Sequence, residues 1–125
     1  MRLEAAYNDA SGVTEAFVRN ALAHVNRELD ATFDQRRFAY EARWDPGKEW
    51  MDIGLRAREA HSVQLQRPPV ELTFAAGEWL RVEISTKFRR AGVERDAGTA
   101  DLTLESWWTD AAGDFGVALL SGKET

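Results

Sequence analysis

Glu83 and Ser85 are the two side chains in this sequence that are best suited to bind a small polar ligand. They lie in the run 79–86, where apolar and polar residues alternate in the way that predicts a β-strand. Arg81, Glu83 and Ser85 are therefore expected on one face, with about 6 to 7 Å between residues two apart. A carboxylate and a hydroxyl at this spacing suit an imidazole ring, because one ring N–H can donate to the carboxylate while the other nitrogen meets the hydroxyl. The alternative is that both are solvated residues on the polar face of a half-covered sheet.

Four further residues are candidates for the same kind of site. Tyr7 carries a phenol that can donate to a ligand carboxylate, although a partly buried ring with a solvated hydroxyl is the ordinary alternative. Thr14 and Phe17 fall in the first turns of a predicted helix, where a threonine commonly bonds the local backbone and a phenylalanine commonly packs in the core. Ile53 is likewise expected in the core unless it lines the pocket.

The periodicity of apolar residues predicts an α+β fold, with one main N-terminal helix followed by a mostly antiparallel sheet and a C-terminal β-hairpin. The helix is expected over residues 12–29, with Asp9 or Ser11 capping its first turn. Residues 89–101 are weakly helical at best, because each of the two glycines there costs about 1 kcal/mol relative to alanine. Strands are expected at 38–44, 49–58, 60–66, 70–75 (half-buried), 79–86, 102–109 and 115–120.

Composition narrows the classes of function. The chain has 125 residues, enough for one ordinary domain, and its 16 basic against 21 acidic residues give a net charge of −5. Nucleic acid is therefore not expected as a partner, because binding its backbone requires a basic surface. Cysteine is absent and neither histidine has a second ligand at metal-binding spacing, so no disulfide and no metal site are expected. The polar N-terminus is unlike a signal peptide and no membrane association is expected, which favours the cytoplasm. The five tryptophans are expected to anchor the core and interfaces.

Five blocks of the sequence, in order, match a known family. The blocks are Tyr7-Asn8-Asp9 through Arg19-Asn20, Asn26-Arg27-Glu28-Leu29, Phe74-Ala75-Ala76-Gly77-Glu78, Glu83-Ile84-Ser85-Thr86-Lys87-Phe88 and Trp107-Trp108-Thr109-Asp110. They resemble the second half of the histidine-specific Nα-methyltransferases, which make trimethylhistidine on the ergothioneine route. The resemblance implies a two-part enzyme, in which a methyltransferase core binds the methyl donor and a separate lobe binds the amino acid. Residues 1–87 resemble part of the histidine-binding lobe, and residues 88–125 resemble the closing strands of the core.

The resemblance also implies roles for individual residues. Glu83 and Ser85 match the family residues that bind the imidazole ring, and Tyr7 matches a tyrosine that holds the substrate carboxylate. Thr14 and Phe17 match residues that line the same site. The position of Ile53 often carries methionine in close relatives, so the shape of the pocket is expected to differ there. No catalytic, cofactor-binding or metal-binding residue is assigned.

The cofactor implied by the family is S-adenosylmethionine, yet its glycine-rich binding loop does not occur in these 125 residues. The leading hypothesis is therefore the C-terminal, substrate-binding portion of a histidine Nα-methyltransferase, truncated or split and inactive by itself. Its partners would be L-histidine or a methylated histidine, and a separate chain that carries the cofactor-binding half. The alternatives are a non-catalytic remnant that binds imidazole or an amino acid, and an α+β interaction domain whose exposed hairpin pairs with another chain.

Overall fold

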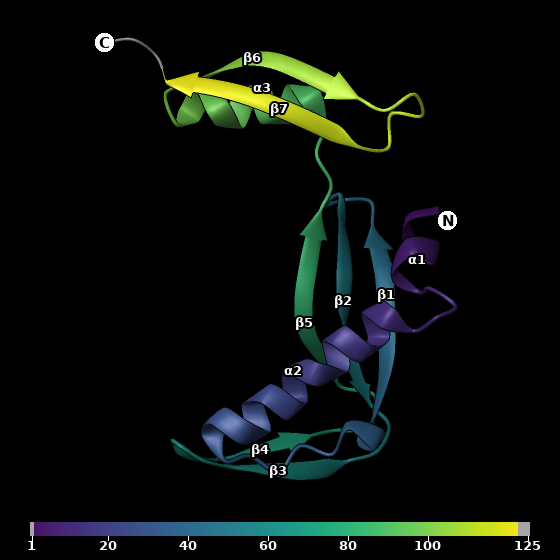
Figure 1. Cartoon of the computed structure of the whole chain (residues 1–125). Helices are drawn as coiled ribbons and strands as arrows, with labels where there is room; N and C mark the ends of the chain where they lie inside the picture. Colours follow the sequence, from purple (N-terminus) through teal and green to yellow (C-terminus); the bar gives the residue numbers. More distant parts are fainter. Residues whose placement is uncertain (1, 123–125) are drawn as a thin grey trace. The chain divides into compact units, whose positions relative to one another are not determined.

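The computed structural model describes residues 2–122, which form two compact units, one up to Thr86 and one from Lys87 onward (Figure 1). Length alone predicts one domain, whereas each of these units has its own internal contacts. The predicted α+β class is confirmed, since helices combine with sheets whose strand pairs are all antiparallel among the described residues.

The first unit is built on a three-stranded antiparallel sheet. Its strands are β1 (Phe38–Asp45), β2 (Trp50–Ala57) and β5 (Trp79–Thr86), in the order β1-β2-β5. Helix α2 (Val13–Leu29) crosses one face of this sheet (Figure 1). Each end of α2, β1, β2 and β5 lies within one residue of the predicted end. β5 lies at the edge of the sheet, so among residues 2–122 it pairs with β2 only.

The hydrophobic core lies between α2 and the sheet. Val18 and Leu22 of α2 are buried against alternate residues of β2, which point to the same face of the sheet. The helix ends at Asp30, whose backbone has φ 51° and donates its N–H to the carbonyl of Asn26. The face of the sheet that α2 covers is therefore the buried face. The buried residues of β2 are Met51, Ile53, Leu55 and Ala57.

A two-stranded hairpin of β3 (His61–Gln66) and β4 (Pro69–Phe74) completes the first unit. The prediction of a half-buried strand is wrong for most of β4, because only its last residue, Phe74, is buried while Val70 and Leu72 are exposed. Phe74 packs edge-on against Phe38 at 5.4 Å between ring centroids, and this contact joins the hairpin to the core. The rest of β4 has no packed layer over it, which leaves its apolar side chains in solvent.

A β-bulge in β5 interrupts the pairing of β5 with β2. Ile53 pairs with Glu83, whereas the next residue, Gly54, pairs with Arg81, so Val82 is an extra residue in β5. Residues that pair directly across two strands point to the same face. The bulge therefore changes which face the residues before Val82 point to: Arg81 lies on the face opposite to that of Glu83.

The bulge overturns the predicted position of Arg81. Ser85 pairs with buried Met51, which puts Ser85 and Glu83 on the α2 side of the sheet. Arg81 instead points to the outer face, where its Nε and Nη2 donate to the two carboxylate oxygens of Asp52, each at 2.8 Å. Glu83 and Ser85 thus share a face as predicted, but Arg81 does not share it with them.

The tryptophans do not form the core that was expected. None of the five, all within the described residues, is fully buried. Trp50 and Trp79 cover the outer face of the sheet, where cations stack over their rings. The guanidinium of Arg43 lies 4.5 Å from the Trp79 ring centroid and the ammonium of Lys48 lies 4.7 Å from that of Trp50. Trp44 packs at the margin of the core.

The second unit consists of α3 (Arg90–Thr99) and the hairpin of β6 (Leu102–Thr109) and β7 (Gly116–Gly122). A full helix forms where only weak helicity was expected, because tertiary contact compensates for its two glycines. Ala97 of α3 is buried, and the helix lies against β6. The predicted hairpin is confirmed.

Candidate functional site

Tyr7 and Ser85, which lie 78 residues apart in the sequence, meet in the first unit. Tyr7 ends the short helix α1 (Arg2–Tyr7), which the sequence analysis did not predict and which lies beside β1 (Figure 1). The phenol oxygen of Tyr7 is 2.7 Å from Oγ of Ser85 on β5, and either hydroxyl can be the donor. Two of the candidate residues are therefore in direct contact.

Glu83 lies two residues before Ser85 on the same face of the edge strand, and its side chain is exposed. Its cross-strand partner is Ile53, which is 1% exposed and belongs to the core. Ile53 thus lies in the core beside Glu83, and its side chain is not accessible at the surface. The pairing of β5 with β2 fixes the backbone positions from which the Glu83 carboxylate and the Ser85 hydroxyl project.

The start of α2 is organised by Asp9. Its carboxylate accepts hydrogen bonds from the backbone N–H groups of Val13 at 2.9 Å and Thr14 at 3.2 Å, and from the hydroxyl of Ser11 at 2.6 Å. These bonds, with that from Ser11 the strongest, hold the pKa of Asp9 well below its usual range. Of the two residues predicted to cap the helix, Asp9 therefore accepts from the first free backbone amides, and Ser11 donates to Asp9.

Thr14 and Phe17 are three residues apart and share one face of α2 near its start. Thr14 is half-buried beside Asp9, with which it bonds, whereas Phe17 is 69% exposed and Val13 beside it is 67% exposed. The expectation that Phe17 packs in the core is wrong. The beginning of α2 presents two large apolar side chains that the first unit does not cover.

A hollow of about 240 Å³ lies next to this helix start. One of its lining residues, Tyr40 of β1, was not identified from the sequence. The Tyr40 hydroxyl donates to the backbone carbonyl of Tyr7 at 2.6 Å. Burial raises the pKa of Tyr40 to about 12, and the nearby carboxylates add to this effect. The phenol is therefore a neutral donor at ordinary pH. The lining residues are Tyr7, Asn8, Asp9, Glu15 and Tyr40.

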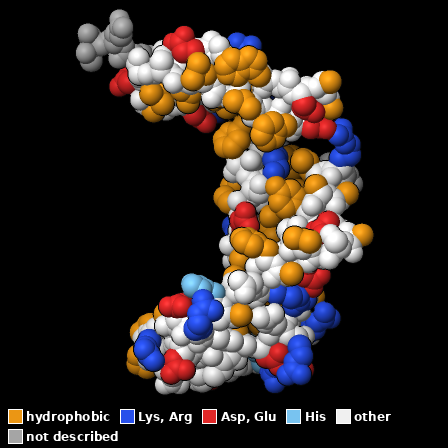
Figure 2. Space-filling view, viewed as in Figure 1, with side chains coloured by type: hydrophobic (Ala, Val, Ile, Leu, Met, Phe, Trp, Pro, Cys, Tyr) orange, Lys and Arg blue, Asp and Glu red, His pale blue; other side chains and the backbone are white. Residues whose placement is uncertain are grey.

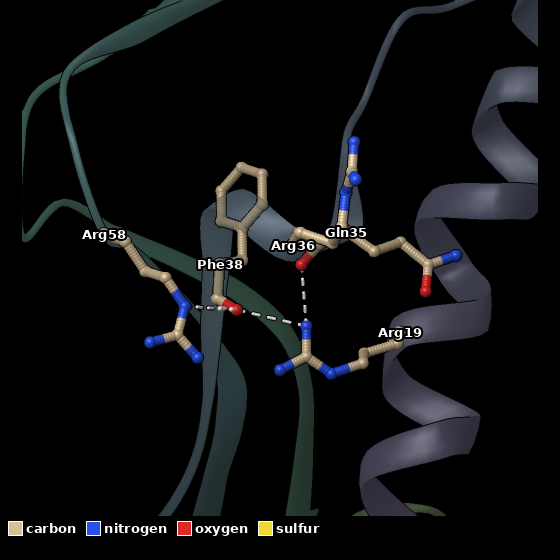
Figure 3. A pocket seen from close by; sticks show the side chains of 5 residues that line it. All are labelled: Arg19, Gln35, Arg36, Phe38 and Arg58. Carbon is tan, nitrogen blue, oxygen red and sulfur yellow. Dashed lines mark hydrogen bonds between the residues drawn. The ribbon is translucent and has the colours of Figure 1, made fainter.

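A wider hollow of about 380 Å³ contains none of the predicted site residues (Figure 3). In it, Nη1 of Arg19 donates to the carbonyls of Gln35 at 2.8 Å and Phe38 at 3.1 Å, and Nε of Arg58 donates to the same carbonyl of Phe38 at 3.3 Å. These bonds fasten α2 to the short 3-10 helix η1 (Gln35–Arg37) and to the start of β1. We interpret the guanidinium of Arg19 as structural.

The turn around Gly113 and Gly116 does not fit the S-adenosylmethionine that the resemblance implies. A nucleotide-binding loop requires a glycine-rich turn between a strand and a helix start, whereas Gly113 and Gly116 lie in or beside the turn between β6 and β7. The ring of Trp107 also lies 2.9 Å from the position that a Cβ at Gly116 would take. We assign none of the described residues to this cofactor. Across residues 2–122, no helix combines the length and the apolar character that crossing a membrane demands.

The first unit is an α+β lobe in which the hydroxyls of Tyr7 and Ser85 meet, with Glu83 on the same face of β5. Residues 1–122 match the family of S-adenosylmethionine-dependent, histidine-specific methyltransferases. The chain belongs to this family.

Curated relatives agree with the family match. The chain is 48% identical over 118 residues to a histidine N-alpha-methyltransferase of Mycolicibacterium smegmatis. The aligned region covers 94% of the chain and 37% of that relative. The corresponding enzyme of Mycobacterium tuberculosis is 43% identical with the same coverage. An N-methyltransferase of Aspergillus flavus is 26% identical over 112 residues, covering 89% of the chain and 30% of the relative. The chain thus spans between 30% and 37% of the length of these curated relatives.

Proposed function

We propose that this chain is the C-terminal, histidine-binding portion of an S-adenosylmethionine-dependent L-histidine Nα-methyltransferase on the ergothioneine route, located in the cytoplasm. Residues 1–87 form part of the histidine-binding lobe, and residues 88–125 supply strands to the methyltransferase core. The observation that carries the proposal is the contact between the hydroxyls of Tyr7 and Ser85, with Glu83 on the same face of β5. Family membership supports the choice of histidine as the ligand.

The two ends of histidine are assigned to different parts of the site. Glu83 accepts the ring N–H and the Ser85 hydroxyl meets the other ring nitrogen, while the Tyr7 phenol donates to the substrate carboxylate. Each hydroxyl offers one proton and two lone pairs. If Tyr7 donates to the substrate carboxylate, Ser85 keeps their mutual hydrogen bond by donating to the Tyr7 oxygen, and Ser85 then accepts the second N–H of a protonated imidazole ring. Holding the ring and the carboxylate fixes the direction of the α-amine, and this positioning is what the described residues contribute to catalysis.

Glu83 also accounts for selectivity among aromatic amino acids. A carboxylate covered by a phenyl ring has no hydrogen-bond partner, and the loss amounts to several kcal/mol. An indole offers a single N–H and no second polar atom for Ser85. Histidine is therefore favoured over phenylalanine and tryptophan. Thr14 and the exposed ring of Phe17 lie on the adjoining helix face and are proposed to line the same site.

The second unit supports the proposal that a longer protein completes the fold. Trp108 and Val117 pair across β6 and β7, and with Phe115 and Leu119 they form an apolar stripe in which each side chain is more than half exposed. Figure 2 shows hydrophobic side chains gathered on this unit. We propose that the remaining length of the enzyme, which this chain lacks relative to its relatives, covers the apolar stripe, whether as a continuous or a separate chain.

Calorimetry with histidine tests the assignment of the ring-binding residues. Glu83→Gln keeps the shape but removes the charge, so we expect its affinity to fall about 10-fold or more, in line with hydrogen bonds to charged groups. Glu71→Gln on exposed β4 is the matched control and should bind like the wild type. Equal binding by the wild type and Glu83→Gln would remove Glu83 from the site.

Complementation tests the enzymatic part of the proposal. The chain is mixed with the portion of the Mycolicibacterium smegmatis enzyme that it does not match, together with S-adenosylmethionine and histidine, and methylated histidine is measured by mass spectrometry. We expect methylation only when both parts are present and less of it with Glu83→Gln. Histidine binding without methylation would favour the non-catalytic remnant, and neither binding nor association would contradict the proposal.

A further inference from the structure

The side chain of Tyr40 contacts the backbone of Tyr7 directly. Its hydroxyl donates to the Tyr7 carbonyl at 2.6 Å, from a strand position 33 residues further along the chain. Tyr40 pairs with buried Leu55 on β2, so it points to the same face of the sheet as Glu83 and Ser85. The Tyr40 side chain is therefore on the side of the sheet that carries the proposed site.

The position of Tyr7 depends on such polar contacts. Helix α1 is only six residues long and contains no fully buried residue, although Leu3 and Tyr7 are partly buried and pack against the core. Hydrogen bonds to β1 add to this packing, and two of them are longer than the bond from Tyr40. Nδ2 of Asn8 donates to the carbonyl of Ala42 at 3.2 Å, and the backbone N–H of Trp44 donates to Oε1 of Glu4 at 3.2 Å. Of these three bonds, only the bond from Tyr40 ends on Tyr7 itself.

We propose that Tyr40 is a positioning residue for the histidine site, because its hydrogen bond to the Tyr7 backbone holds the Tyr7 phenol against Ser85. This inference rests on the proposed function, since the site is the one assigned above to histidine. A series of bonds runs from Tyr40 on β1, through the Tyr7 peptide and side chain, to Ser85 on β5. Tyr40 acts on the ligand through Tyr7.

Removing the Tyr40 hydroxyl should therefore weaken histidine binding only while the Tyr7 hydroxyl is present. In calorimetry on the full chain, we expect Tyr40→Phe to lower the affinity about three- to tenfold, the effect of one neutral hydrogen bond. In a Tyr7→Phe background, the same change should have little further effect, because the group that Tyr40 positions is gone. Equal losses in both backgrounds would overturn the proposal and leave Tyr40 a general stabiliser.

A second measurement does not require histidine to bind. The chain has two tyrosines, so ring-labelled protein gives one Cζ resonance for each, and Tyr7→Phe and Tyr40→Phe assign them. We expect Tyr40→Phe to move the Tyr7 resonance and to remove the shift that Ser85→Ala produces in the wild type. An unchanged Tyr7 resonance would overturn the positioning role. If the wild type binds no histidine but this coupling is present, the proposed function fails and the positioning role stands.

The matched control removes a hydrogen bond elsewhere in the same unit. Thr32→Val deletes the acceptor of the 2.9 Å bond from the Gln64 backbone N–H. We expect it to leave the histidine affinity and the Tyr7 resonance unchanged, although it lowers thermal stability. If Thr32→Val weakens histidine binding as much as Tyr40→Phe does, loss of stability explains both results and the proposal is wrong.

Discussion

At the scale of single residues, the ionisation of Tyr40 provides a direct test of its surroundings. Burial, the largest cause, and the charges of Asp9, Glu15 and Glu83 raise the pKa of Tyr40 to about 12, from 10.0. In Tyr7→Phe only Tyr40 remains to titrate, and phenolate absorbance should rise with a midpoint near 12. A midpoint near the ordinary value would contradict the buried, anion-flanked environment.

The same shift predicts how stability changes at alkaline pH. The folded state favours the neutral phenol, so its contribution is fully present below the ordinary pKa of 10.0 and is lost as the pH rises through about 12. Thermal unfolding of the wild type should therefore shift to lower temperature between these values. Tyr40→Phe should show a smaller decrease over the same range, because it has no phenol to ionise.

The residue pair on β5 could be predicted from the sequence, but its neighbours could not. Glu83 and Ser85 lie on the same side of the bulge, so simple alternation holds between them. Arg81 lies beyond the extra residue, and nothing in its local sequence indicates that the pairing shifts. Tyr40 was missed because its role depends on meeting a backbone carbonyl far away in sequence. The phenol of Tyr7 made it a candidate by residue type, but only the resemblance grouped it with Glu83 and Ser85.

At the scale of elements, the bulge depends on the small size of Gly54. A Cβ at this position would collide with the carbonyl oxygen of Leu80 and lie 2.9 Å from the Trp79 ring, so β2 and β5 would have to separate. We expect Gly54→Ala to reduce the free energy of unfolding by about 1–3 kcal/mol or more, as for other overpacked sites. Gly47→Ala, where the nearest atom is 3.4 Å away, should change it little. Thermal or urea unfolding compares the two, and equal stabilities would contradict the close approach.

The start of α2 gives a second test at this scale. Because hydrogen bonds lower the pKa of Asp9 in the folded state, its contribution to stability is present above the ordinary value of 3.8 and is lost as the pH falls below it. Asp9→Ala should therefore lower the melting temperature at pH 7, and the difference from the wild type should shrink in acid. Ser11→Ala, which leaves the carboxylate bonded to two backbone amides, should have a smaller effect. A difference that does not depend on pH would exclude the ionised cap.

Elements with strong apolar periodicity were predicted well, and those held by tertiary contacts were not. The spacing of Val18 and Leu22 indicates α2 without further information. Helix α1 is too short to leave a periodic pattern, and α3 contains two glycines that argue against a helix until its contact with β6 is known. The exposure of β4 also depends on what covers it, which local alternation does not encode.

At the scale of the whole molecule, the apolar stripe of the second unit gives the clearest prediction. If the rest of a methyltransferase covers it in the complete enzyme, the chain by itself should self-associate or bind a hydrophobic dye through Val117 and Leu119. The double variant Val117→Thr, Leu119→Thr should reduce both dye fluorescence and the sedimenting mass. It should also weaken association with the cofactor-binding portion in the complementation mixture.

A matched pair on the first unit separates this effect from a general loss of apolar surface. Val70 and Leu72 on β4 are also exposed and two residues apart, so Val70→Thr, Leu72→Thr removes the same side chains elsewhere. We expect this control to associate with the partner portion as the wild type does, because the proposed cover lies over the second unit only. Equal weakening by both double variants would show that association depends on total exposed hydrophobicity. The apolar stripe would then not be the specific surface that the remainder of the enzyme covers.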